Sequence, residues 1–171
     1  MPLLPVVTID QKNPILHHPT KEVTNFEDPA LATLIGDMVV TMYAKDGIGL
    51  AAPQIDSPLR ITVIVPEPTQ FEKYKRAVTK EALVMINPVI TRHSLFKEKG
   101  EEGCLSIPGV FGDVKRWQTV TATYRDPAGR PQIIQAKGLM ARVIQHEIDH
   151  LDGILFVDRA EKLYQVTPEK K

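Results

Sequence analysis

The sequence predicts an α+β protein: small antiparallel or mixed β-sheets packed around a buried helix in the C-terminal half, with an amphipathic helix near the N-terminus. Two stretches with helical periodicity and several β-rich stretches support this fold class. The length of 171 residues predicts one domain over residues 1–171. Lys+Arg and Asp+Glu both number 21, so no global charge favours nucleic acid or an anionic membrane.

The first helix is expected to begin at Asp28 and Pro29, which suit the N-cap and the first turn. The apolar residues that follow recur at spacings of three and four, which predicts one buried stripe. They are Leu31, Leu34, Ile35, Met38, Val39, Met42 and Tyr43. Asp46 and Gly47 are expected to end the helix.

The β-rich stretches are 59–65, 82–90, 118–125 and 131–137. A Pro-Ala-Gly turn separates the last two, which predicts a hairpin. The charged, proline-containing stretch 66–82 is expected to be an exposed insertion, and 165–171 a flexible tail.

The second helix is expected from Gly138 to about Leu151, with Gly153 ending it. Steps of three, four and seven place the residues of one face in line. They are Leu139, Val143, His146, Glu147 and His150. A second, apolar stripe lies beside them, so the helix should be buried with three titratable groups pointing inward.

The stretch QHEIDHLDG carries two histidines four residues apart, with Glu147 directly after the first. Imidazoles about 6 Å apart along a helix axis can close on one metal ion, and the glutamate then faces the open side of the metal. The alternative is that these are ordinary hydrogen-bonded polar residues. The cost of burying charged groups without partners favours the metal site.

A metzincin protease would continue this string as HExxHxxGxxH. The sequence follows the pattern through Gly153, but Phe156 stands where the third histidine is needed. A glutamate ligand would have to be Glu161 or Glu169, close to the end of the chain. Both observations weaken the protease interpretation.

Cys104 is the only cysteine, so an internal disulfide is excluded. A buried apolar filler, a nucleophile and a metal ligand remain. The glycine before it suits an extended segment close to a neighbouring backbone. Together with the two histidines, the thiolate would complete a three-ligand site with the fourth place free for water. Because the sequence shows neither a leader-like segment nor a membrane-spanning apolar run, we expect the protein to work in a reducing cytoplasm.

The third string is GIGLAAPQ, residues 47–54. A phosphate loop is disfavoured because no strand leads into it and no helix follows. A turn between helix and strand is enough to explain Gly47 and Gly49. Alternatively, the small residues of the string would let a substrate backbone approach, and Gln54 would offer an uncharged amide donor.

Together, GIGLAAPQ, EGCLS and QHEIDHLDG resemble the three signature motifs of peptide deformylases. The resemblance extends to INP at 86–88 and GILFVDR at 153–159, and covers most of residues 10–160. The sequence departs from many relatives at His17, in the length of 66–82, and in lacking most of a basic C-terminal helix used near ribosomes.

The resemblance implies a hydrolase that removes the formyl group from N-terminal formylmethionine of new polypeptides. It implies that the bound metal is ferrous iron, which zinc, nickel or cobalt can replace. The types of donor atom alone would predict zinc. By the resemblance Cys104, His146 and His150 are metal ligands and Glu147 is the catalytic glutamate. Gln54 and the Leu105 N–H match the oxyanion donors.

For the substrate, the resemblance implies a methionine slot lined by Ile48, Leu139 and Val143, with Arg142 at its rim. Ile48, Gly49 and Gly103 would form hydrogen bonds with the peptide backbone, as the edge strand of a sheet does. The expected partners are nascent formylmethionyl peptides near the ribosome, and no binding to nucleic acid or membrane is expected. The protein is expected to be a monomer or a weak dimer. The remaining alternatives are a small HExxH endopeptidase and a catalytically silent metal- or peptide-binding module.

Overall fold

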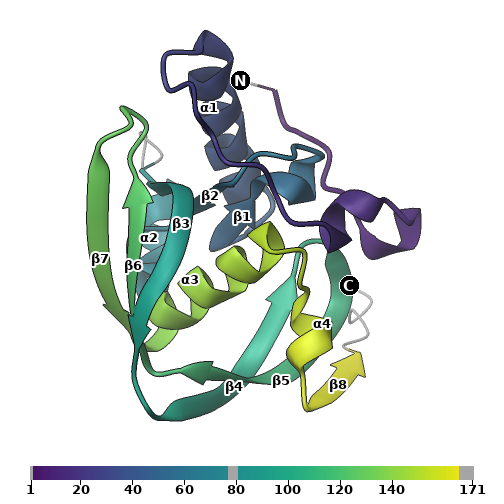
Figure 1. The fold of residues 1–171 in the computed structure, drawn as a ribbon. Helices are drawn as coiled ribbons and strands as arrows, with labels where there is room; N and C mark the ends of the chain where they lie inside the picture. The colour runs from purple at the N-terminus through teal and green to yellow at the C-terminus, as the bar shows by residue number, and fades with distance from the viewer. Residues whose placement is uncertain (1, 77–80, 166–171) are drawn as a thin grey trace.

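The structure is a computed structural model that describes residues 2–76 and 81–165. The helices are α1 (Pro29–Ala44), α2 (Phe71–Arg76), α3 (Gly138–Leu151) and α4 (Phe156–Arg159). The strands are β1 (Gly49–Ala51), β2 (Ile61–Ile64), β3 (Leu83–His93), β4 (Lys97–Cys104), β5 (Ile107–Trp117), β6 (Thr119–Arg125), β7 (Pro131–Lys137) and β8 (Lys162–Gln165). Figure 1 shows α3 lying between two sheets.

The larger sheet has the order β1-β2-β3-β6-β7, and the smaller has the order β4-β5-β8. Neighbouring strands of both sheets run antiparallel. The predicted α+β class, with sheets packed around a helix of the C-terminal half, is confirmed. β1 is an edge strand of the larger sheet and β4 an edge strand of the smaller one. Within the described residues, no helix has the length and apolar character needed to cross a membrane.

Helix α1 forms as its sequence predicts. The Asp28 carboxylate accepts a hydrogen bond from Ala30 N at 2.9 Å, and Pro29 occupies the first turn. Six of the seven stripe residues are buried, and Leu34 is partly buried. The stripe packs with β1 and β2 into one core cluster, which fixes the position of the loop that follows α1.

The four predicted β stretches correspond to β2, β3, β6 and β7, and the last two form the expected hairpin. The hairpin β4–β5 was not predicted. Strand β4 is rich in Lys, Glu and Gly, and neither strand shows the period-two apolar pattern that marks a half-buried strand. The extended geometry expected around Cys104 is nevertheless present. A Cβ on Gly103 would lie 2.8 Å from the Phe111 ring of β5, so this pairing requires glycine.

The stretch 66–82, expected as an exposed insertion, contains α2, and Phe71 and Tyr74 pack against the cluster formed by α1 and β2. Residues 77–80 of this stretch lie outside the described residues. So do residues 166–171 of the expected tail.

Helix α3 spans the predicted residues, Gly138 to Leu151. Gly138 and Gly153, which bracket it, have φ of 58° and 75°, values that favour glycine. At Gly153 a Cβ would also lie 2.7 Å from the His17 carbonyl carbon, so the turn after α3 packs tightly on the N-terminal segment. Ile144 and Ile148 pack with β3 and β6 in a second core cluster, which holds the helix against the larger sheet.

Candidate metal centre and active site

The three predicted ligand residues lie together. Cys104 at the end of β4 and His146 and His150 on α3 place their donor atoms within 4.8 Å of one another. The His150 Nε2 lies 3.2 Å from the Cys104 Sγ, and the two imidazole rings meet edge-on with centroids 4.9 Å apart. One sulfur and two nitrogens at this spacing suit a divalent transition metal.

The thiol group is prepared for ligation by its surroundings. Burial raises the pKa of Cys104, but the neighbouring His150 and His146 lower it well below its ordinary value. The backbone N–H of Ser106 donates to the sulfur at 3.4 Å. Because the thiolate is the form that binds metals, the site fits the ion it is expected to hold.

The two histidines do not behave as ordinary core residues. The buried His150 Nδ1 has no hydrogen-bond partner among the described residues. His146 bonds through Nδ1 to the Glu102 Oε2 at 2.9 Å, which leaves its Nε2 for the site. The interpretation of these residues as satisfied structural polar groups is therefore weaker than the metal-ligand interpretation.

Glu102 is a site residue that the sequence reasoning missed. Burial raises the pKa of Glu102, but hydrogen bonds from Arg116 and His146 outweigh it and hold that pKa well below its usual range. The carboxylate therefore accepts a hydrogen bond from the His146 Nδ1 and orients the ring, as acidic partners of metal-binding histidines do. The available signal was spacing: Glu102 precedes Cys104 by two residues, which places both on one face of a strand.

Glu147 lies beside the predicted ligands, buried at 3% exposure. Burial raises its pKa, and this outweighs the opposing effect of the two histidines. A Cβ on Gly49 would lie 2.3 Å from Glu147 Oε1, so the carboxylate rests against the β1 backbone. A carboxyl group with a raised pKa in a closed site suits proton transfer near neutral pH.

Gln54 and Leu105 bring hydrogen-bond donors to the same place. Ala51 N donates to the Gln54 Oε1 at 2.8 Å, which fixes the amide so that its Nε2 faces Cys104 Sγ at 3.3 Å. Nε2 also lies 3.2 Å from the Ser106 hydroxyl. The Leu105 N–H, in the turn between β4 and β5, makes no hydrogen bond to another described residue. Both groups therefore lie as oriented donors next to the predicted ligands.

A cavity of about 500 Å³ joins these groups. It lies between the edge strands β1 and β4, and α3 forms one wall. Its lining includes Gln54, Cys104, Leu105, His146 and Glu147 together with all six predicted substrate-binding residues, Ile48, Gly49, Gly103, Leu139, Arg142 and Val143.

Arg142 lines the cavity, but its guanidinium is engaged elsewhere. It donates to the Glu102 carboxylate at 2.9 Å and to the carbonyl oxygens of Val114 and Glu98 at 2.9 and 2.8 Å. The charged group therefore ties α3 to the β4–β5 hairpin, and what the residue offers the cavity is its aliphatic stem.

Phe156, which occupies the position of the third metzincin histidine, is buried and stacks on the His146 ring with centroids 6.2 Å apart. The residue supports the imidazole and supplies no donor atom. The geometry thus agrees with the sequence argument against a metzincin site.

The comparison with known families decides the classification. The family model for polypeptide deformylase matches residues 3–166. The chain belongs to this family. The peptide deformylase of Thermosynechococcus vestitus is 49% identical over 147 residues, covering 86% of this chain and 74% of that protein. That of Natranaerobius thermophilus is 46% identical over 153 residues, covering 90% of each.

Solved deformylase structures agree with the fold. The crystal structure of a peptide deformylase from Synechococcus elongatus in complex with actinonin has a TM-score of 0.83 and 44% identity, covering 95% of this chain and 83% of that one. The Thermotoga maritima deformylase has a TM-score of 0.82 and 33% identity, covering 95% and 100%. The chain is therefore a metal-dependent hydrolase that removes the N-formyl group from the N-terminal formylmethionine of newly synthesised polypeptides.

Proposed function

We propose that Cys104, His146 and His150 hold the divalent ion of the deformylase and that Glu147 is its general acid–base. Gln54 Nε2 and the Leu105 N–H are the oxyanion donors. The observation that carries this assignment is the clustering of the three ligand atoms within 4.8 Å, next to the buried carboxylate of Glu147. Residues that meet in this way from β4, α3 and the segment after β1 require a joint role.

The ion is proposed to be ferrous iron, with zinc, nickel or cobalt as replacements. When bound, a divalent cation supplies Lewis acidity and lowers the pKa of water from 15.7 to roughly 7, which makes attack on an amide feasible at neutral pH. The thiolate–imidazole donor set suits all four metals, so the choice of iron rests on the resemblance to the family.

Glu147 moves the proton. Its carboxylate takes a proton from the attacking water and delivers it to the amine that leaves as the formyl C–N bond breaks, giving formate and a free N-terminus. The raised pKa that burial gives Glu147 suits both halves of this transfer. The contact with Gly49 limits the positions that the carboxylate can adopt.

The oxyanion donors act as the formyl carbon becomes tetrahedral. The Gln54 amide is held by Ala51 N before substrate arrives, and the Leu105 N–H is held by the two-residue turn of the hairpin. Donors oriented in advance stabilise the developing negative charge without reorganisation at the moment of reaction.

The substrate is proposed to lie between the two sheet edges. The backbone of Ile48 and Gly49 at β1 and of Gly103 at β4 would pair with the formyl-peptide backbone. The methionine side chain would enter the slot formed by Ile48, Leu139 and Val143.

The cellular setting follows from the substrate class. We place the enzyme in the cytoplasm, acting on nascent formylmethionyl peptides near the ribosome as a monomer or weak dimer. Sedimentation of the metal-loaded protein at micromolar concentration checks the assembly: a stable species larger than a dimer would contradict it.

The test of the proposed activity is an anaerobic assay of formate release from formyl-Met-Ala-Ser by the ferrous-loaded protein. The expected result is stoichiometric formate and free Met-Ala-Ser. Inertness towards this peptide, combined with cleavage of an internal bond in an N-acetylated peptide, would overturn the assignment in favour of an endopeptidase. Inertness towards both peptides would favour a silent binding module.

A further inference from the structure

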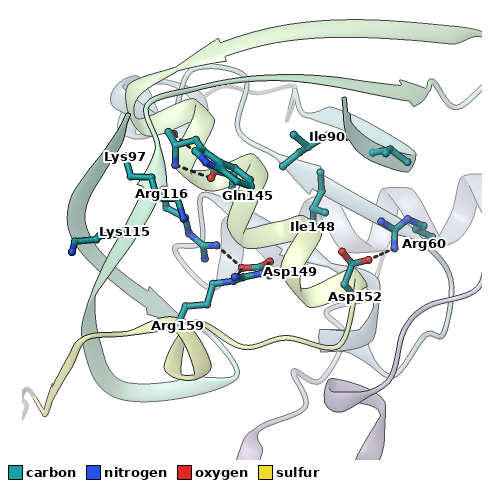
Figure 2. A pocket seen from close by; sticks show the side chains of 12 residues that line it. Arg60, Ile90, Lys97, Lys115, Arg116, Gln145, Ile148, Asp149, Asp152 and Arg159 are labelled. Atoms are coloured by element: carbon teal, nitrogen blue, oxygen red, sulfur yellow. Dashed lines mark hydrogen bonds and ion pairs between the residues drawn. The ribbon is translucent and has the colours of Figure 1, made fainter. Parts of the chain in front are cut away.

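Helix α3 has a second face that carries polar side chains and lines a cavity. Gln145, Ile148, Asp149 and Asp152 lie on the side of the helix opposite to His146 and Glu147, and they line a separate cavity of about 300 Å³ (Figure 2). In this view Asp149 lies between two guanidinium groups, Arg116 from β5 and Arg159 from α4. None of these three residues lines the substrate cavity.

The ion pairs on this face connect directly to the metal centre. Arg159 binds both oxygens of Asp149, with Nε to Oδ2 at 2.6 Å and Nη2 to Oδ1 at 2.7 Å. Arg116 Nη1 donates to the same Oδ2 atom. Through Nε and Nη2, Arg116 donates to both oxygens of Glu102 at 2.9 Å. Glu102 in turn accepts from the His146 imidazole.

Most of this chain of charges is closed to solvent. The side chains of Glu102, Arg116 and Asp149 are 4%, 5% and 10% exposed, whereas that of Arg159 is 44% exposed. Buried charges are tolerated only in good hydrogen-bonding geometry, so each group fixes the next. A bidentate guanidinium–carboxylate pair fixes orientation as well as distance. Arg159 therefore sets the position of Asp149 from the partly exposed end.

The placement of α4 explains how Arg159 reaches this point. The glycine turn at Gly153 brings the chain back along α3, and the Asp158 carboxylate accepts from Leu155 N at 2.8 Å at the start of α4. Phe156 at one end of this short helix stacks on the His146 ring, and Arg159 at the other end binds Asp149. The single turn of α4 thus contacts the His146 ring at one end and the Asp149 carboxylate at the other.

We propose that Arg159 is a positioning residue for the metal centre, acting through Asp149, Arg116 and Glu102 on the His146 imidazole. This inference rests on the proposed role of His146 as a metal ligand. The alternative is that the Arg159–Asp149 pair only ties α4 to α3. Such a purely structural role would change the unfolding temperature and leave the properties of a bound metal ion unaltered.

The experiment uses the full-length protein loaded with cobalt, whose visible absorption reports the ligand geometry. The variants are Arg159→Gln and Arg159→Lys, with Arg130→Gln as the control, because Arg130 forms an ion pair with Asp126 on the exposed β6–β7 turn. The readouts are the cobalt spectrum and the rate at which a chelator removes the metal.

Arg159→Gln is expected to shift the cobalt bands and to speed metal loss about threefold to tenfold, less than the 10–100-fold typical of a direct partner of a ligand. Arg159→Lys should recover part of the effect, because lysine keeps the charge and loses the bidentate contact. Arg130→Gln should match the wild type. A changed unfolding temperature with an unchanged spectrum and chelation rate for Arg159→Gln would overturn the proposal.

A double-mutant cycle adds a second criterion. If Arg159 acts through Asp149, Arg159→Gln should have little further effect on the rate of metal loss in an Asp149→Asn background, since both changes interrupt the same series of ion pairs. Full additivity would contradict it. Cys104→Ala is measured in parallel: its loss of metal confirms which site is observed, so a negative result for Arg159 is distinct from a failure of the metal assignment.

Discussion

The Glu147 carboxylate occupies the space that a side chain at position 49 would need. A Cβ on Gly49 would lie 2.3 Å from Glu147 Oε1 and 2.8 Å from its Cδ. The glycine of β1 and the glutamate of α3 are thus complementary, although 98 positions separate them in the sequence. This contact holds the proposed general acid–base in place.

Gly49→Ala should therefore fold and bind metal but lose most activity. Gly49 does not have a positive φ, so alanine is compatible with its backbone. The methyl group must displace the carboxylate, and a displacement of about 1 Å can cost roughly 10²-fold in rate. Steady-state deformylation measures this, and Gly47→Ala serves as a comparison, because a Cβ there would lie 3.0 Å from Leu105 Cδ1 and 3.3 Å from the Gly49 carbonyl oxygen but would not displace the Glu147 carboxylate. Equal effects of the two variants would contradict the account.

Cys104→Ala should leave the protein with far less than one metal ion per chain. The thiolate is one of three proposed protein ligands, and alanine has no donor atom. Elemental analysis after purification measures the content. In the wild type, the single thiol should react more slowly with a thiol reagent when metal is bound. Unchanged metal content in the variant would mean that the third ligand lies elsewhere.

Glu102→Gln should weaken metal binding about 10- to 100-fold, the range for residues that orient a ligating histidine. It should also lower stability, because Arg116 and Arg142 would both lose the buried charge that they share. Competition with a chelator and thermal unfolding measure the two effects. Glu101→Gln, one position earlier on β4 with an exposed side chain, is the control and should bind metal normally.

Gln54→Glu should lower activity, because it removes a donor and places a negative charge beside the Cys104 sulfur. The acceptor oxygen for Ala51 N is kept, while the Nε2 donor is removed. Loss of one oxyanion donor lowers kcat by about 10²- to 10³-fold. Metal content should stay near that of the wild type. A variant with unchanged kcat would exclude Gln54 from the oxyanion site.

The elements with strong local signals were predictable from the sequence. Helix α3 is bracketed by Gly138 and Gly153, and α1 starts at a clear Asp28 cap, so their bounds follow from neighbouring residues. The pairing of β4 with β5 depends on partners such as Gly103 and Phe111 that show no apolar alternation. Short-range periodicity carries no information about such a pair.

The site also has a part that could be predicted from the sequence and a part that could not. The predicted ligands and cavity residues were recognisable as motif positions. The support of His146 by Glu102, and of Glu102 by Arg116, joins residues that are 44 and 14 positions apart. The first contact depends on how α3 packs against the smaller sheet and the second on the pairing of β4 with β5, and neither can be read from the spacing of residues within one element.

The central claim is that Glu147 transfers the proton at a metal centre built by Cys104, His146 and His150. The most direct measurement is anaerobic formate release from formyl-Met-Ala-Ser by Glu147→Gln, loaded with ferrous ion to the wild-type stoichiometry. The rate should be lower than that of the wild type by about 10²- to 10⁴-fold, the contribution of a general acid–base. A near-wild-type rate with the metal bound would contradict it.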